Sequence, residues 1–263
     1  MALEVARAVH AAASERGLRY VFKSSYLKDN RTSARSFTGL GLEEGLRILA
    51  RVRETVGVPV LTDVHELEEI EPVAAVVDAL QIPAFLCRQG RLIERCAATG
   101  RTLNVKKGQF LAPADMVEAV AKIRAVRPEA EILLTERGSA FGYRDLVVDM
   151  RSIALMRGLG CRVVFDATHS LQRPGRGGDR RWARPLARAA LAAGAEGIFA
   201  EIHPRPERAR CDASTQLPMG AVGALIDEWA AVGELIERLE KEGPQFEGPN
   251  WPGLETPSGG PGS

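Results

Sequence analysis

Short hydrophobic runs alternate along the chain with longer segments in which apolar residues recur at helical spacing. The runs are rich in β-branched residues and predict seven strands, near residues 19–24, 58–63, 77–84, 102–106, 131–135, 162–167 and 197–202. The segments between them predict amphipathic helices; within residues 41–57, for example, one face carries Leu42, Leu46, Leu49 and Val56. Other helices are expected near residues 3–14, 182–193 and 219–241.

Strict alternation of these elements predicts an α/β architecture with a parallel sheet, because helices that join successive strands make right-handed crossovers. At 263 residues, a TIM-type (β/α)8 barrel with seven recognisable strands and eight helices is the leading candidate. We interpret residues 1–242 as a single catalytic domain of this type that lacks the N-terminal strand. Residues 243–263 are rich in Pro and Gly, and we predict a disordered tail there.

Composition narrows the class of protein. The formal net charge of +1 argues against a nucleic-acid-binding platform, which is usually strongly basic. The chain has neither an apolar run of membrane-spanning length nor an N-terminal signal pattern, so we expect a cytoplasmic protein without a membrane partner. The cysteines, at positions 87, 96, 161 and 211, are widely spaced, which argues against a disulfide framework and a structural zinc site.

Three polar stretches follow predicted strands, at residues 21–33, 104–110 and 134–143. They place cationic side chains at strand ends, namely Lys23, Lys28, Arg31, Lys106, Lys107 and Arg137. Arg and Lys bind phosphate and carboxylate oxygens through charge-assisted hydrogen bonds. The pattern therefore predicts a phosphorylated small molecule as substrate.

Barrel enzymes carry their active sites at the C-terminal ends of the strands. Polar residues recur there after every predicted strand and include Ser25, Asn30, Asp63, Gln81, Arg88, Gln109, Asp166, His169 and Glu201. Any one of them is more often a solvated or locally paired group. Their recurrence on all seven strands favours a shared site.

One imidazole and two carboxylates form a separate candidate group, His169, Glu201 and Asp212. Such side chains suit Fe²⁺, Zn²⁺ or Mn²⁺. Ion pairs and a hydrogen-bonded imidazole explain the same residues without a metal, and spacing alone leaves both interpretations open.

A series of motifs carries a resemblance to a known family: VFKSSYLKDNRTS, GLEEGL, VPVLTDVHE, DALQIPAFLCRQ, NVKKGQF, LTERGSAFGY, LVVDMRS, FDATHSLQ and EIHPRPERARCDASTQLP. Over residues 3–240 the chain resembles the 3-deoxy-D-manno-octulosonate 8-phosphate synthases, also called 2-dehydro-3-deoxyphosphooctonate aldolases. The resemblance implies a homotetrameric TIM barrel. It also implies a transferase that condenses phosphoenolpyruvate with D-arabinose 5-phosphate, releases phosphate and serves lipopolysaccharide biosynthesis.

The resemblance assigns substrate contacts. Residues matching Lys23, Lys106 and Arg137 hold the phosphate and carboxylate of phosphoenolpyruvate, assisted by Ser25. The segment of Asn30, Arg31 and Thr32 matches a loop whose arginine reaches the phosphate of arabinose 5-phosphate, partly across a subunit boundary. Three matching residues shape the pocket: Gln81, Arg88 and Gln109.

The resemblance also suggests catalytic roles, which we take as a hypothesis. Asp63 and Lys28 match groups that hold the sugar hydroxyls and the aldehyde. Cations such as Lys28 and Lys106 would stabilise the departing phosphate and the developing alkoxide, and His169 would help to hold the water that adds to C2.

The chain looks closer to the metal-dependent branch of the family, whose ligands match His169, Glu201 and Asp212. The fourth ligand in that branch is a cysteine on the first strand, and this sequence begins after it. We favour a coding start further upstream over an altered protein. Smaller departures are Gly108, where the family commonly has proline, and a shorter loop at residues 173–185.

Three alternatives remain open from the sequence. The first is a related 3-deoxy-heptulosonate 7-phosphate synthase that uses erythrose 4-phosphate. The second is a Schiff-base aldolase with Lys23 or Lys106 as the amine. The third is a non-catalytic remnant that binds phosphorylated ligands or a partner without turnover.

Overall fold

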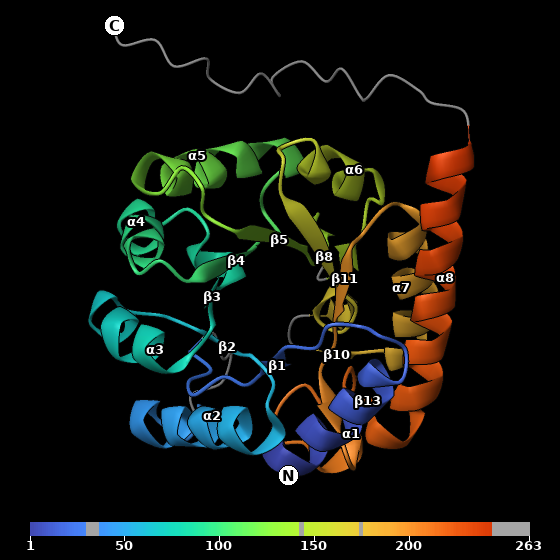
Figure 1. The fold of residues 1–263 in the computed structure, drawn as a ribbon, viewed down its shortest axis with the longest axis horizontal. Coiled ribbons are helices and arrows are strands. Elements are labelled where there is room, and N and C mark those ends of the chain that lie inside the picture. The colour runs from blue at the N-terminus through green and yellow to red at the C-terminus, as the bar shows by residue number, and fades with distance from the viewer. Residues whose placement is uncertain (30–36, 142–144, 174–175, 244–263) are drawn as a thin grey trace, which may run out of the picture.

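A curled, parallel sheet forms the centre of the computed structural model, which describes residues 1–29, 37–141, 145–173 and 176–243 (Figure 1). Its seven strands run in the order β1-β2-β3-β4-β5-β8-β11. Their bounds are β1 Phe22–Lys23, β2 Val60–Asp63, β3 Ala79–Ile82, β4 Thr102–Lys106, β5 Ile132–Glu136, β8 Arg162–Asp166 and β11 Gly197–Phe199. All seven predicted strands are confirmed, and the order is that of a TIM-type α/β fold. Within the described residues, β1 and β11 are the edge strands of this sheet.

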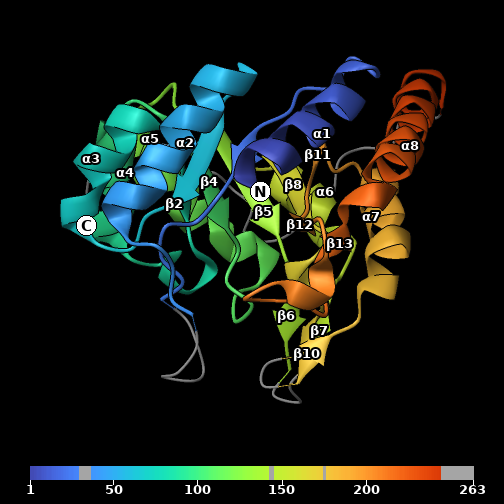
Figure 2. The ribbon, with the colours of Figure 1, turned by 90° about the horizontal axis from the view of Figure 1, so that it is seen from below.

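Helices surround the outer face of the sheet (Figures 1 and 2). They are α1 Ala2–Ser14, α2 Leu42–Val56, α3 Ile70–Val76, α4 Gly90–Ala98, α5 Met116–Val126, α6 Arg151–Arg157, α7 Ala183–Ala192 and α8 Val222–Glu242. The predicted helices are confirmed to within three residues at each end. In α2 the predicted apolar face is buried at Leu46 and Leu49, and the helix ends at Gly57, whose φ of 74° favours glycine.

The main core lies between the outer face of the sheet and these helices. Strand residues such as Leu103, Leu134 and Phe165 are fully buried in it. A second small cluster joins the two ends of the described chain, because Val9 of α1 packs with Ile226 of α8. None of the helices in the described ranges combines the length and the apolar character needed to cross a bilayer.

Three two-stranded sheets follow the main strands and were not predicted: β6 Ser139–Ala140 with β7 Leu146–Val147, β9 Gln172–Arg173 with β10 Gly177–Gly178, and β12 Ile202–His203 with β13 Leu217–Pro218. Each strand has two residues, too few to show a hydrophobic period. They order the loops beyond the C-terminal ends of β5, β8 and β11, where the candidate site lies.

Candidate active site

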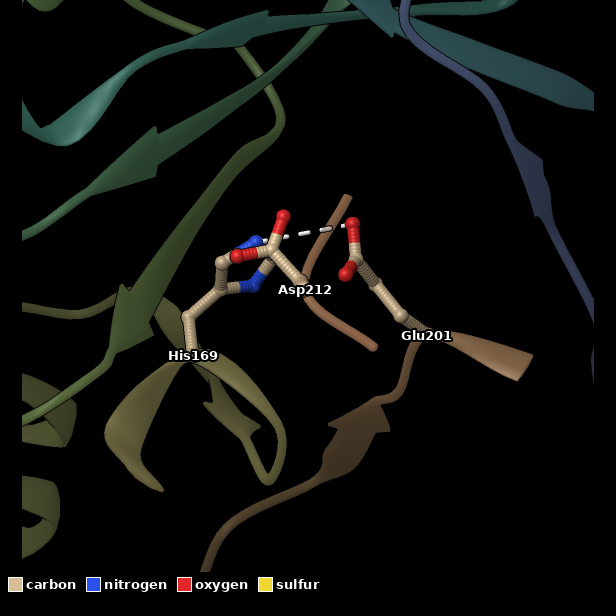
Figure 3. A group of neighbouring side chains, drawn as sticks. All are labelled: His169, Glu201 and Asp212. Carbon is tan, nitrogen blue, oxygen red and sulfur yellow. Dashed lines mark ion pairs between the residues drawn. The ribbon is translucent and has the colours of Figure 1, made fainter. Parts of the chain in front are cut away.

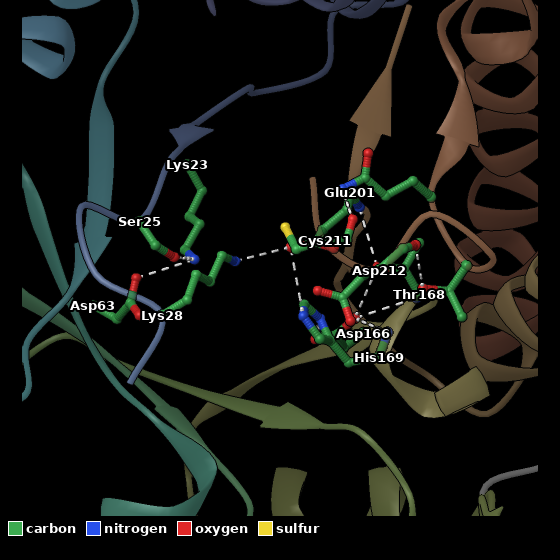
Figure 4. Close-up of polar contacts among 12 residues, drawn as sticks. Lys23, Ser25, Lys28, Asp63, Asp166, Thr168, His169, Glu201, Cys211 and Asp212 are labelled. Atoms are coloured by element: carbon green, nitrogen blue, oxygen red, sulfur yellow. Dashed lines mark hydrogen bonds and ion pairs between the residues drawn. The ribbon is translucent and has the colours of Figure 1, made fainter. Parts of the chain in front are cut away.

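The C-terminal ends of the parallel strands bring polar side chains together in one place (Figure 4). We call this group the strand-end cluster: Lys23, Lys28, Asp63, Lys106, Arg137, Asp166, His169, Glu201 and Asp212. The parallel register explains the convergence, because four of these residues are each the last residue of a strand of the main sheet: Lys23, Asp63, Lys106 and Asp166. Spacing in the sequence could not show this, since these residues are far apart along the chain.

On the β1–β2 side, Lys23 is paired with Asp63. Lys23 Nζ lies 3.1 Å from Asp63 Oδ1 and donates a hydrogen bond to Ser25 Oγ. His65 Nε2 lies 3.1 Å from the other carboxylate oxygen. Burial alone would raise the pKa of Asp63, but the charge of Lys23 and the His65 hydrogen bond outweigh it and hold the pKa well below its usual range. Asp63 is therefore an anion that can accept hydrogen bonds.

Lys28 connects this side to β11. Its Nζ lies 3.3 Å from Glu201 Oε1. Figure 4 draws both side chains in the cluster. Burial opposes the charge on Lys28, but the negative charges of Glu201 and Asp63 outweigh burial and raise the pKa of Lys28. The side chain is thus a cation at neutral pH and a hydrogen-bond donor fixed in the cluster.

Lys106 is the most deeply buried cation of the cluster. Its Nζ donates to Asp166 Oδ2 at 2.5 Å and lies 3.9 Å from the centre of the Phe199 ring. Burial lowers the pKa of Lys106, and repulsion by Lys23 and Arg137 lowers it further, whereas Asp166 acts in the opposite sense. The positive charges of Lys23, Lys106 and Arg137 therefore lie close enough in the strand-end cluster to repel one another.

Arg137 follows β5 and is held by a neutral partner. Its Nη2 donates to Gln172 Oε1 at 2.8 Å and to the His169 carbonyl at 3.3 Å. Gln172 in turn donates to Asp212 Oδ1 at 2.7 Å. Burial lowers the pKa of Arg137, although a guanidinium remains charged at any working pH. The guanidinium of Arg137 is therefore held in one orientation by the protein itself.

The predicted metal ligands His169, Glu201 and Asp212 lie together (Figure 3), with one ligand atom from each within 4.8 Å of the others. His169 Nδ1 lies 2.8 Å from Asp166 Oδ2, and Nε2 lies 3.5 Å from Glu201 Oε1. In the neutral imidazole that a metal requires, the Nδ1 proton is donated to Asp166, which leaves the Nε2 lone pair directed toward the two ligand carboxylates. Glu201 Oε2 is buried and has no hydrogen-bond partner in the described part of the chain. The donor set thus fits a divalent transition metal.

Two carboxylates of this region, Glu201 and Asp166, stay ionised. Burial raises the pKa of Glu201, but the charges of His169 and Lys28 outweigh burial and lower it to about 2. The pKa of Asp166 likewise lies well below its usual range, because His169 and Lys106 overcome the opposing effect of burial. A carboxylate must be deprotonated to bind a metal, and Glu201 meets this condition.

The remaining predicted residues lie outside the strand-end cluster. Gln81 is buried on β3 as the register partner of Asp63, and its Oε1 accepts a hydrogen bond from Asn104 at 3.1 Å. Gln109 has a buried Oε1 without a partner among the described residues, and Arg88 is exposed after β3. The predicted sugar-phosphate loop, Asn30, Arg31 and Thr32, falls outside the described residues.

The sequence missed several residues that hold the cluster. Gln172 lies in the FDATHSLQ motif, together with the Asp166 that the sequence placed at a strand end, and its position after a strand was the available signal. Thr168 accepts from the Glu201 amide at 3.1 Å through its Oγ1 and so links the ends of two strands. Phe199, an apolar strand residue, carried no signal for its place beneath Lys106.

Comparison with known proteins agrees with this arrangement. A sequence profile of the DAHP synthetase I family matches residues 1–238. Proteins named 2-dehydro-3-deoxyphosphooctonate aldolase are close relatives: that of Nitratidesulfovibrio vulgaris strain Hildenborough is 55% identical over 89% of this chain and 88% of its own length. The protein of the same name from Bordetella petrii is 50% identical over 90% of this chain and 87% of its own. The chain therefore belongs to the DAHP synthetase I family.

Proposed function

We propose that this protein is a transferase that condenses phosphoenolpyruvate with D-arabinose 5-phosphate and, with uptake of one water at C2, gives 3-deoxy-D-manno-octulosonate 8-phosphate and phosphate for lipopolysaccharide biosynthesis. The name shared by the relatives supports this activity. The observation in the structure that carries it is the convergence of Lys23, Lys106 and Arg137 at the strand ends. Burial lowers the pKa of Lys106, and repulsion by the other two cations lowers it further. A small molecule with several negative charges relieves that repulsion, and phosphoenolpyruvate carries both a phosphate and a carboxylate.

Different residues of the strand-end cluster can perform different parts of the reaction. Lys23, Lys106 and Arg137 hold the phosphate and carboxylate so that C3 of the enol faces the aldehyde. Lys28 stays charged because its pKa is raised, and it donates a hydrogen bond to the aldehyde oxygen as that oxygen becomes an alkoxide. Asp63 is ionised and accepts a hydrogen bond from a sugar hydroxyl.

We propose that His169, Glu201 and Asp212 hold a divalent metal, Fe²⁺, Zn²⁺ or Mn²⁺. When bound, the ion supplies a Lewis acid beside the substrates. Asp166 contributes by fixing the His169 tautomer, and the unpartnered Glu201 Oε2 supports the assignment. Metal analysis of the purified protein, followed by chelation and readdition of each ion, tests it; a protein that stays metal-free and fully active would overturn it.

The activity is tested by phosphate release from phosphoenolpyruvate with arabinose 5-phosphate or erythrose 4-phosphate as the second substrate. Faster turnover with arabinose 5-phosphate supports the proposal. Preference for erythrose 4-phosphate would instead indicate a 3-deoxy-heptulosonate 7-phosphate synthase. Thermal stabilisation by phosphoenolpyruvate without any phosphate release would indicate a non-catalytic binding protein.

A Schiff-base aldolase is the second candidate, because Lys106 is buried with a lowered pKa, as an imine-forming lysine requires. Its hydrogen bond to Asp166 favours the protonated amine and so the first proposal. Inactivation by borohydride in the presence of substrate would reverse this preference.

We further propose that the protein is a homotetramer of the cytoplasm without nucleic-acid or membrane partners. Large apolar side chains exposed beyond β3, β4 and β5 support association: Phe85 is 53%, Phe110 55% and Phe141 64% exposed. The mass in solution, measured by light scattering, tests the oligomeric state, and a monomer would refute it.

A further inference from the structure

A second ion pair lies directly beside the substrate-facing cations. Lys107 follows Lys106 in the sequence, and Glu136 precedes Arg137. Lys107 is 0% exposed and Glu136 is 1% exposed, and Lys107 Nζ lies 3.6 Å from Glu136 Oε1. The proposed chemistry uses neither residue. A charge pair with no access to solvent carries a large desolvation cost, so its presence calls for a role.

The register of β4 and β5 explains why neighbouring residues have different surroundings. Lys106 is the partner of Thr135, and the amide of Lys107 donates to the Thr135 carbonyl at 2.9 Å, so pairing continues past the end of β4. Successive residues of a strand point to opposite faces. Lys106 and Arg137 therefore belong to the face of the strand-end cluster, whereas Lys107 and Glu136 lie on the opposite face of the same two strand ends.

The ammonium of Lys107 also joins the loops that follow the two strands. It donates to Ser139 Oγ at 3.1 Å and to the carbonyl of Leu111 at 3.3 Å. Glu136 Oε1 accepts from the Gly138 amide at 2.6 Å. These contacts tie the segment after β4 to the segment after β5 immediately behind the substrate-facing side chains.

We propose that the Lys107–Glu136 pair positions Lys106 and Arg137 for phosphoenolpyruvate. The two substrate-facing cations carry like charges on the same face of adjacent strand ends and so repel each other, and without a ligand they would separate if their backbones could move. The buried pair fixes those backbones at the adjacent residue on each strand. The role rests on the proposed function, and it makes Lys107 and Glu136 positioning residues that do not touch substrate.

Three variants test the role: Lys107→Met, Glu136→Gln and the double variant with both changes. Each single change leaves one buried group without its partner and should lower the melting temperature. The double variant removes both charges, so it should recover stability, but Met cannot donate to Ser139 or Leu111. Its KM for phosphoenolpyruvate should stay raised about tenfold or more, with KM for the sugar phosphate within about twofold of wild type.

A matched control is Val52→Ala on α2, which removes buried volume from a helix that packs on α1, α3 and β2. It should lower the melting temperature without changing either KM. A double variant with wild-type KM for phosphoenolpyruvate would overturn the positioning role, as would an equal rise in both KM values.

Calorimetric titration with phosphoenolpyruvate alone compares the affinities of the wild type and the double variant without turnover. Wild-type protein that binds phosphoenolpyruvate but releases no phosphate would count against the proposed function, while a weaker affinity of the double variant would still support the positioning role.

Discussion

Replacing Arg137 with alanine tests the charge argument most directly. The guanidinium is only 6% exposed and already directed by Gln172, so it loses little freedom when an anion binds. A hydrogen bond to a charged group contributes about 1.5–3 kcal/mol, which corresponds to a loss of about 10- to 150-fold in kcat/KM for phosphoenolpyruvate. The loss should appear mainly as a higher KM, with kcat reduced where the contact strengthens as the phosphate departs.

The assay is steady-state phosphate release with phosphoenolpyruvate varied and arabinose 5-phosphate saturating. Arg137→Lys is the matched control, because it keeps the charge and loses the planar fork. It should fall between the wild type and Arg137→Ala. Near-ultraviolet circular dichroism of both variants checks that the fold is intact.

Two results would refute the reasoning. One is an unchanged kcat/KM in Arg137→Ala, which would remove Arg137 from the substrate site. The other is an equal loss for both substrates in a stable protein, because a general disturbance of the site does not distinguish phosphoenolpyruvate from the sugar phosphate.

Other features give further expectations. Burial and the charges of Lys23 and Arg137 lower the pKa of Lys106, so kcat/KM for phosphoenolpyruvate should fall on the alkaline side below the ordinary lysine value of 10.5, and a profile that stays flat to that pH would contradict this. The pKa of Glu201 is about 2 in the folded protein, against an ordinary value of 4.5. The ionised side chain therefore stabilises the metal-free protein by about 3 kcal/mol above pH 4.5, and this contribution is lost as the pH falls toward 2. Urea unfolding of Glu201→Gln should accordingly show a shallower acid dependence. In Gly45→Ala the new Cβ would lie 2.3 Å from Tyr26 Cβ, and overpacking of about 1–3 kcal/mol should exceed the helix-propensity gain of about 1 kcal/mol. The control Gly233→Ala meets nothing within 4 Å and should stabilise α8 in the same unfolding assay.

The central sheet could be predicted because its strands are buried on both faces and read as short apolar runs. Residues 102–106 and 162–167, for example, match β4 Thr102–Lys106 and β8 Arg162–Asp166 to within one residue. The paired loops beyond the strands could not be predicted, because a strand of two residues such as β9 carries no period. Their pairing depends on contacts between residues that only the folded sheet brings together.

The site was predictable at the level of strand ends but not of individual partners. The sequence groups Lys106 and Lys107 together as cationic residues, and the structure separates them: one faces Asp166 in the strand-end cluster, the other is buried against Glu136. Alternation along a strand predicts that neighbours point to opposite faces, but which of them faces the cluster is fixed by register across β4 and β5. Gln172 was missed for a related reason, since a neutral amide gives no charge signal.

The charge balance of the strand-end cluster links the two proposed ligands. Its four lysine and arginine side chains are Lys23, Lys28, Lys106 and Arg137. Its four carboxylates are Asp63, Asp166, Glu201 and Asp212, so the two sets of charges cancel when all eight groups are ionised. A divalent ion held by Glu201 and Asp212 would add two positive charges to this balance, which a dianionic phosphate can then neutralise. Phosphoenolpyruvate should therefore bind more tightly to the metal-loaded protein than to the chelated one, and metal affinity should rise by the same factor when phosphoenolpyruvate is present. Calorimetric titrations in both orders measure this coupling. If phosphoenolpyruvate bound equally well to the metal-loaded and the chelated protein, the two sites would not be coupled and the charge argument would be wrong.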